Sequence, residues 1–274
     1  MAQSAQTLNI AVIGASGRLG RLVLAEAIRR PGLRLVGGMV SSDSINLDAD
    51  LGELAGLSYL GLSTVSALEE AIDGADIVID VSAPKVTAAI AGRLAAGGGP
   101  ALVTGVTGLD AGQRDTLRAA SEHMAVLHAR NFSLGVAVME RLVGEAAAAL
   151  KADQFDLEIV ETHHKRKADA PSGTALTLGE AAAAGRGEPF DSVARFEPPH
   201  GDGRGPIGTI GFAAVRGGGV VGEHAVRFLG AMEEVAISHR AFDRAIFAKG
   251  AIEAALWLRG KPAGFYTMAD VAGG

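Results

Sequence analysis

The chain has 274 residues, of which 48% are apolar and 20% charged, and its formal net charge is −6 at pH 7. This balance is typical of a globular protein with one large domain or two smaller ones. The negative charge argues against nucleic acid as the main partner, because phosphate backbones bind clustered lysine and arginine. The chain has no cysteine, which excludes disulfides, thiolate metal ligands and cysteine nucleophiles.

No targeting segment or membrane-spanning segment is predicted. The first residues, MAQSAQTLNIAVIGASG, do not resemble a signal peptide, because they lack a basic region followed by a long apolar stretch. Apolar runs elsewhere in the chain are too short to span a bilayer. We therefore expect a cytoplasmic protein with no membrane partner.

The first forty residues predict a strand, a glycine turn, a helix and a second strand. An apolar run at 8–13 is followed by the sequence GASGRLG at 14–20. Apolar residues then recur at helical spacing as far as Pro31, and a second apolar run covers 33–40. This order of elements is a βαβ unit.

The alternation of strands and helices continues through the first half of the chain. Further strands are predicted at 76–81, 101–104 and 125–129, with helices at 84–96 and 110–123. Such alternation favours an α/β fold with a doubly wound parallel sheet of the Rossmann type. The predicted dinucleotide-binding domain covers residues 1–130, and a helix at 245–258 is expected to bring residues 245–274 back onto it.

A second domain of the α+β class is predicted for residues 131–244. After a helix at 134–150, residues 155–159 alternate between apolar and polar, as a half-exposed antiparallel strand does. More strands are predicted at 207–215, 223–229 and 234–239. We expect a mixed sheet that serves substrate binding and oligomerisation.

The glycine turn is the first candidate site. Its glycines fall at i, i+3 and i+6 rather than in the GxGxxG spacing, but the physical logic is the same. Glycine permits a tight turn, and a pyrophosphate binds free N–H groups at a helix N-terminus. Arg18 could add a charged contact to a phosphate. An ordinary glycine turn between a strand and a helix is the alternative, and the N-terminal βαβ context favours nucleotide binding.

The end of the second strand bears on the choice of cofactor. NAD-specific proteins often place an acidic residue there to bind the ribose 2′-hydroxyl. Here Val40 is followed by Ser41, Ser42 and Asp43. Two hydroxyls and the nearby Arg18 suit a 2′-phosphate better than an acid does, so Ser41 is a candidate cofactor contact and NADPH is favoured over NADH. Asp43 could still reach the ribose.

The segment ETHHKRKADAPSGTA at 161–175 is the most informative in the chain. It places two histidines and three cations within five positions and ends in a helix start at Ser172. A solvated basic loop is the simplest interpretation. A zinc site lacks an obvious third ligand. A catalytic site that protonates a bound carboxylate substrate fits best beside a dinucleotide fold, because histidine titrates near neutral pH and a helix start binds anions.

Five motifs in order together resemble one family. They are GASGRLG, TGVTGL, RNFSLGV, ETHHKRKADAPSGTAL and GTIGFAAVRGGGVVGEH, and they span nearly the whole chain. The chain is similar to the dihydrodipicolinate reductases, which reduce 4-hydroxy-tetrahydrodipicolinate on the diaminopimelate route to lysine. The resemblance implies NADPH or NADH as cofactor, a small dicarboxylate substrate, no metal and a homotetramer.

The resemblance also implies roles for particular residues. His163 would be the proton donor, and Lys167 the second catalytic residue. The substrate carboxylates would be bound by His164, Gly173 and Thr174. Cofactor contacts are implied for Gly14, Ala15, Ser16, Gly17, Arg18, Leu19, Gly105, Val106, Thr107, Arg130, Asn131, Phe132 and Ser133.

The chain departs from the family pattern at three places. Val40-Ser41 stands where Glu-Arg is common, which affects the expected cofactor preference. Val106 stands in a loop that usually reads GTTG, and Arg130 replaces a common alanine. The pair Glu223-His224 resembles part of the family's tetramer-forming sheet, and we assign it no chemistry.

Two other functions compete with this one. Another two-domain dehydrogenase of an amino-acid semialdehyde or imino acid would share the glycine turn. It would have no reason to keep His163, Lys167 and the helix start at Ser172 together. A nucleotide-sensing regulatory protein would need a surface for DNA or a partner, and no basic recognition helix is found.

Overall fold

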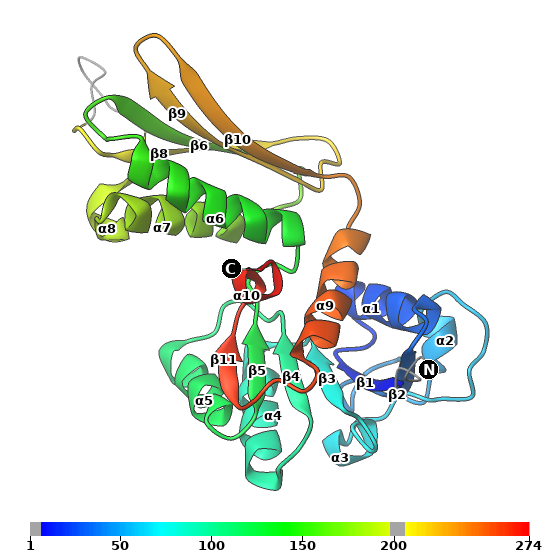
Figure 1. The fold of residues 1–274 in the computed structure, drawn as a ribbon. Helices are drawn as coiled ribbons and strands as arrows, with labels where there is room; N and C mark the ends of the chain where they lie inside the picture. Colours follow the sequence, from blue (N-terminus) through cyan, green and yellow to red (C-terminus); the bar gives the residue numbers. More distant parts are fainter. Residues whose placement is uncertain (1–6, 198–205, 274) are drawn as a thin grey trace, which may run out of the picture. The chain divides into compact units, whose positions relative to one another are not determined.

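The computed structural model describes residues 7–197 and 206–273 (Figure 1). The described chain divides into two compact units. The first takes its residues from 7–133 and 245–273, and the second from 134–197 and 206–244. Residues 1–6 and 274, which the sequence assigns to the dinucleotide-binding domain, lie outside the described residues.

The first unit is built on a six-stranded parallel sheet with the order β11-β5-β4-β3-β1-β2. The strands are β1 (Leu8–Ile13), β2 (Leu33–Met39), β3 (Ile77–Asp80), β4 (Ala101–Thr104), β5 (Ala125–His128) and β11 (Gly264–Tyr266). Helices cover both faces of the sheet, so the inner strands are buried on both sides and consist mainly of apolar residues. The predicted parallel sheet is confirmed, and β11 adds an edge strand that the sequence analysis did not predict.

Helices lie on the two faces of this sheet. They are α1 (Arg18–Arg29), α2 (Leu51–Leu54), α3 (Leu68–Ala71), α4 (Pro84–Gly97), α5 (Ala111–Ser121), α9 (Ala245–Leu258) and α10 (Met268–Val271). Helices α4 and α5 pack together on one face, while α1 and α9 pack together on the other (Figure 1). Local signals set their ends. Pro84 begins α4, Gly98 ends it in the left-handed region, and Asp110 and Gln113 form a capping box at the start of α5.

The second unit contains a mixed five-stranded sheet with the order β10-β9-β6-β8-β7. Its strands are β6 (Phe155–His163), β7 (Ala194–Arg195), β8 (Ile210–Arg216), β9 (Gly222–Gly230) and β10 (Glu234–Ala241). The central strand β6 runs parallel to β8 and antiparallel to β9. The mixed sheet that the sequence predicts is confirmed.

Three helices, α6 (Leu134–Ala149), α7 (Gly173–Arg186) and α8 (Phe190–Val193), accompany this sheet, and α6 and α7 pack against one of its faces (Figure 1). Leu157 and Ile159 of β6 and Val226 and Phe228 of β9 form the core beneath the helices. Two residues further along β6 the inward side chains become polar, beginning at Glu161. This change along one face provides the setting for the candidate site.

Strand β6 is longer than predicted. The alternating pattern predicts a strand that ends at Ile159, whereas the strand continues to His163. The period-two alternation persists in the structure, but its last inward positions carry Glu161 and His163 rather than apolar side chains. His163 is therefore the last residue of a strand, not part of a loop. Among the described residues, no helix has the length and apolar character needed to cross a membrane.

Candidate functional site

The glycine turn joins β1 to α1 at the carboxyl edge of the parallel sheet. Gly14 has φ +79°, and a Cβ there would lie 2.9 Å from Cα of Ser82. A Cβ at Gly20 would lie 2.1 Å from the carbonyl oxygen of Gly14. Both positions therefore require glycine. Gly17 is the N-cap of α1 and supplies no capping side chain, so the first N–H groups of the helix are left for another partner.

The other predicted cofactor residues lie after neighbouring strands of the same sheet. Ser41 lies two residues after β2, Gly105–Thr107 follow β4, and Arg130–Ser133 follow β5. The carboxyl ends of parallel strands lie at one edge, and β1 and β3 are the neighbours between which the strand order reverses. Direct contacts link some of these loops. Amides of the glycine turn donate to Met39, and a Cβ at Gly105 would meet the ring of Phe132.

Asp80, which the sequence analysis did not select, organises this edge. Its side chain is fully buried at the end of β3. It accepts hydrogen bonds from the Ser82 amide at 3.0 Å, the Ser82 hydroxyl at 2.5 Å, Thr87 at 2.6 Å and Thr104 at 3.1 Å. Asp80 thereby holds the connection between β3 and α4 against the end of β4, next to Gly14.

The polar end of the inner face of β6 forms a compact cluster in the second unit. Nδ1 of His163 lies 2.5 Å from Oε2 of Glu161. The guanidinium of Arg216, at the end of β8, binds both oxygens of Glu161, with NH1 at 2.8 Å and NH2 at 2.6 Å. The Glu161 side chain is 1% exposed, so its charge is neutralised inside the protein.

The protonation states in this cluster follow from its contacts. Burial alone would raise the pKa of Glu161, but hydrogen bonds from Arg216 and His163 outweigh burial and hold that pKa below its ordinary value. Glu161 is therefore ionised at neutral pH, and Nδ1 of His163 donates to it. Burial lowers the pKa of His163, while Glu161 acts in the opposite direction. The proton that His163 can exchange is consequently the one on Nε2.

The start of α7 adjoins the same cluster. Ser172 is the N-cap, and its hydroxyl accepts from the Ala175 amide at 3.2 Å. The amide of Ser172 donates to Oε1 of Glu161 at 3.1 Å, and its hydroxyl contacts Nε2 of His224 at 3.0 Å. The rings of His163 and His224 are 5.1 Å apart. The helix start predicted at Ser172 is present, and its N–H groups form an end suited to anions.

The remaining predicted substrate and catalytic residues surround this helix start. Gly173 and Thr174 are the first two residues of α7. Lys167, on the connecting loop, donates to Asp169 at 2.8 Å and is close enough that its charge lowers the pKa of His163. His164 contacts Arg244 through Nε2 at 2.9 Å. The adjacent histidines therefore have different partners.

Sequence reasoning missed three members of the cluster, Glu161, Arg216 and His224. We assigned no chemistry to the Glu223-His224 pair, and the structure places His224 within this cluster, in contact with Ser172 and His163. His224 is 3% exposed, and burial, followed by the neighbouring His163, lowers its pKa to about 4. A usable signal was the period-two pattern of β6, which puts Leu157, Ile159 and Glu161 on the same face as His163. The partners on β8 and β9 carried no local signal.

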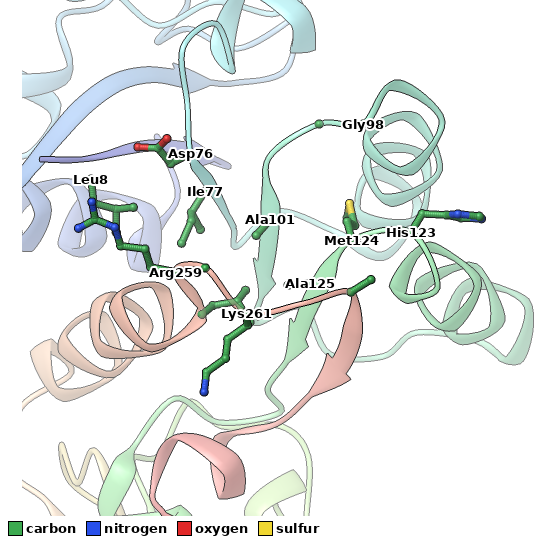
Figure 2. A pocket seen from close by; sticks show the side chains of 14 residues that line it. Leu8, Asp76, Ile77, Gly98, Ala101, His123, Met124, Ala125, Arg259 and Lys261 are labelled. Carbon is green, nitrogen blue, oxygen red and sulfur yellow. The ribbon is translucent and has the colours of Figure 1, made fainter. Parts of the chain in front are cut away.

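A cavity of about 450 Å³ in the first unit lies away from the glycine turn (Figure 2). It is lined by residues at the amino ends of strands, including Leu8, Ile77, Ala101 and Ala125. The glycine turn lies at the opposite, carboxyl ends. Ligands of open α/β sheets bind at the carboxyl ends, so this cavity is not the expected nucleotide site.

Two family models match the chain almost from end to end. The model described as "Dihydrodipicolinate reductase, N-terminus" matches residues 8–132. The model described as "Dihydrodipicolinate reductase, C-terminus" matches residues 135–272.

Curated proteins and solved structures match over similar lengths. A Mesorhizobium japonicum protein named 4-hydroxy-tetrahydrodipicolinate reductase 1 is 44% identical over 267 residues, which is 97% of each chain. A Sinorhizobium fredii protein named 4-hydroxy-tetrahydrodipicolinate reductase is 46% identical over 267 residues, again 97% of each. A dipicolinate-bound dihydrodipicolinate reductase from Paenisporosarcina sp. TG-14 has a TM-score of 0.77 at 22% identity and covers 96% of this chain and 98% of that one. At that identity, the structural likeness shows the shared fold.

Proposed function

The chain belongs to the dihydrodipicolinate reductase family, and we propose that it reduces 4-hydroxy-tetrahydrodipicolinate to tetrahydrodipicolinate with NAD(P)H. This step belongs to the diaminopimelate pathway of lysine biosynthesis, and we propose that it takes place in the cytoplasm. The reaction takes up a hydride and a proton and releases water. The observation that carries the proposal is the buried His163, held through Nδ1 beside a helix start and a lysine.

The first unit is proposed to hold the nicotinamide cofactor. The close approaches at Gly14 and Gly20 and the uncapped start of α1 fit a pyrophosphate, because they leave backbone N–H groups and no side chains at the turn. Gly14–Leu19 would hold the pyrophosphate. Gly105–Thr107 and Arg130–Ser133 would line the rest of the cofactor. When bound, the cofactor supplies the hydride.

The second unit is proposed to bind the two carboxylates of the substrate and to deliver the proton. The N–H groups of Gly173 and Thr174 and the side chain of His164 are suited to accept carboxylates, and Lys167 adds a positive charge. In its protonated form, His163 carries the transferable proton at Nε2, since Nδ1 is engaged with Glu161. A Cβ at Gly222 would lie 3.1 Å from Nε2, so glycine at this position leaves room beside that nitrogen.

We infer a preference for NADPH over NADH. Arg18 is exposed at the first position of α1, and Ser41 and Ser42 follow the end of β2. These groups suit a 2′-phosphate. The carboxylate of Asp43, which accepts a hydrogen bond from Ser41, would instead repel a 2′-phosphate. The ratio of kcat/KM for NADPH to that for NADH should therefore exceed one and rise further in Asp43→Asn.

We also propose a homotetramer formed through the second unit. Helices α6 and α7 cover one face of the mixed sheet, and the other face carries a group of small and apolar side chains between charged ones such as Glu158 and Arg227. Ala213, Val160 and Ala225 are cross-strand neighbours there, and Val215, on the same face, is 49% exposed. A face of this kind suits contact with a second copy. Sedimentation equilibrium should give four times the chain mass of 27.8 kDa.

A steady-state assay with freshly generated substrate and each reduced cofactor tests the function. We expect substrate-dependent oxidation of the cofactor. His163→Gln should lower kcat by about 10²- to 10⁴-fold, the usual contribution of one general acid. The dissociation constant of His163→Gln for NADPH should stay within about twofold of the wild-type value, because the proposed cofactor residues lie in the other unit.

The matched control is His123→Gln, which changes an exposed histidine of the first unit. It should leave kcat unchanged. Absence of substrate-dependent oxidation by the wild type would reject the proposed reaction. Full turnover by His163→Gln would reject only the assignment of the proton donor.

A further inference from the structure

Arg216 and Glu161 form a two-point contact inside the second unit. Both nitrogens NH1 and NH2 of the guanidinium bind the carboxylate, at 2.8 and 2.6 Å. The Glu161 side chain is 1% exposed and that of Arg216 is 19% exposed. A buried ion pair is often no more stabilising than an apolar pair of the same volume. Its presence in the core therefore needs a reason other than stability.

The contacts of Glu161 lead to the segments that carry the proposed chemistry. Oε2 binds Nδ1 of His163, and Oε1 accepts the amide of Ser172, the N-cap of α7. One carboxylate thus fixes both the ring of the proposed proton donor and the helix start proposed to bind carboxylates. Because the two oxygens serve different segments, any rotation of this side chain would disturb both.

The contacts of Arg216 extend to the loop between β6 and α7. NH2 donates to the backbone carbonyl of Asp169 at 2.7 Å, in addition to its bond with Glu161. Asp169 in turn accepts a hydrogen bond from Lys167 at 2.8 Å. A single guanidinium therefore ties the loop that carries Lys167 to the strand that carries His163.

We propose that Glu161 and Arg216 are positioning residues, with Glu161 orienting His163 and Arg216 holding the loop of Lys167 against the same strand. This inference rests on the proposed function, since it assigns the pair a role in proton transfer and substrate binding. Neither residue needs to touch the substrate. Their effect is exerted through the orientation and charge of His163 and through the placement of Lys167.

The charges that face His163 predict the direction in which its pKa should change when Glu161 is replaced. They are Glu161 on its own strand, Lys167 on the following loop, Arg216 on β8 and His224 on β9. The Glu161 carboxylate raises the pKa of His163, whereas burial, Lys167 and Arg216 lower it. Glu161→Gln removes the raising charge but keeps the side chain's shape, so the pKa of His163 should fall further. Local disorder would expose the ring and move its pKa upward.

The pKa of His163 can be measured by NMR titration of the ligand-free protein labelled at histidine, with His163→Gln identifying its signal among the seven histidines. We expect a lower pKa in Glu161→Gln than in the wild type. In the assay, kcat should fall about 10- to 100-fold with KM within about threefold, the size expected for a misplaced catalytic group. The decline of kcat/KM at high pH should begin at a lower pH, because protonated His163 becomes scarcer.

Arg216→Lys tests the second half of the inference. Lysine keeps the positive charge beside Glu161 but loses the two-point contact, and it cannot also reach the carbonyl of Asp169 in the same way. We expect KM for the substrate to rise about tenfold through the loosened loop of Lys167. The loss in kcat should be smaller than in Glu161→Gln.

The control is the exposed pair of Arg93 and Glu69 in the first unit, which are joined at 2.8 Å. Glu69→Gln and Arg93→Lys should change neither the pKa of His163 nor the kinetic constants. An unchanged or higher pKa of His163 in a folded Glu161→Gln protein would overturn the inference. A lowered pKa in a chain that does not reduce the substrate would reject the proposed function and leave the orientation of His163 by Glu161 standing.

Discussion

Two buried carboxylates, one in each unit, are bound by different kinds of hydrogen-bond donor. Asp80 ends β3 and Glu161 lies near the end of β6, and each holds the connection from a strand to the next long helix. Asp80 is bound by one amide and three hydroxyls. Glu161 is bound by one amide, an arginine and a histidine.

This difference gives the two carboxylates different roles. The hydroxyl donors around Asp80 keep the same charge across the physiological pH range, so that cluster can only hold geometry. The donors around Glu161 include a histidine, whose charge can change with protonation, and a permanent cation. A change of protonation at His163 is therefore felt by Glu161 and Arg216. We expect Asp80 to have a structural role alone. We expect Glu161 to have a structural role and also to influence the protonation of His163.

The largest expected loss of stability follows Arg216→Met. The substitution leaves Glu161 buried without its cation, which costs about 3–5 kcal/mol of unfolding free energy. Arg93→Met is the control, because its exposed pair with Glu69 contributes about 1 kcal/mol or less. Urea denaturation of both variants measures the difference. Equal losses in the two proteins would show that burial of Glu161 has no energetic consequence.

Asp80→Ala should be the next most damaging change. It leaves the hydroxyls of Thr87 and Thr104 without their buried acceptor and should lower the unfolding free energy by about 2–3 kcal/mol. Asp80→Asn keeps one acceptor oxygen and should lose less. Urea denaturation of both variants measures these losses. Equal losses in Asp80→Asn and Asp80→Ala would show that the acceptor oxygens of Asp80 do not hold the two threonines in place.

The smallest expected effect concerns acid sensitivity at His224. Its pKa is about 4 in the folded protein against an ordinary value of 6.5, chiefly because of burial. Between these values the unfolded chain binds a proton that the folded chain does not, so stability is fully present above pH 6.5 and is lost as pH falls toward 4. From pH 7 to pH 5 the wild type should lose about 2 kcal/mol more than His224→Gln.

Unfolding free energies measured at pH 7, 6 and 5 check this prediction. His123→Gln serves as the control, because it changes an exposed histidine and should keep the acid sensitivity of the wild type. If His224→Gln lost stability on acidification as steeply as the wild type, the buried ring would not be the source.

Much of the architecture was predictable because its signals are local. Short apolar runs identified β1, β3, β4 and β5, and the N-cap serine identified the start of α7. The fold class, with a parallel sheet and a second mixed sheet, follows from the order of these elements. The end of β6 was placed four residues early, because buried polar residues interrupt the apolar pattern there.

The candidate site was only partly predictable. His163, Lys167, Gly173 and Thr174 lie within one segment of the chain and could be selected together. Arg216 is 55 residues from Glu161 in sequence, and His224 is 52 residues from Ser172. Neither stands out locally, since a single arginine or histidine at a strand end is commonplace.

Local chemistry read along the chain was enough to identify the family resemblance, the glycine turn, the segment around His163 and the class of fold. Pairing of β6 with β8 and β9 was needed to show what neutralises Glu161 and which nitrogen of His163 is engaged. The physical reason is that turns, caps and apolar periodicity act between residues near in sequence. The pairing of a buried charge instead depends on strand register between distant segments, which no short stretch of sequence records.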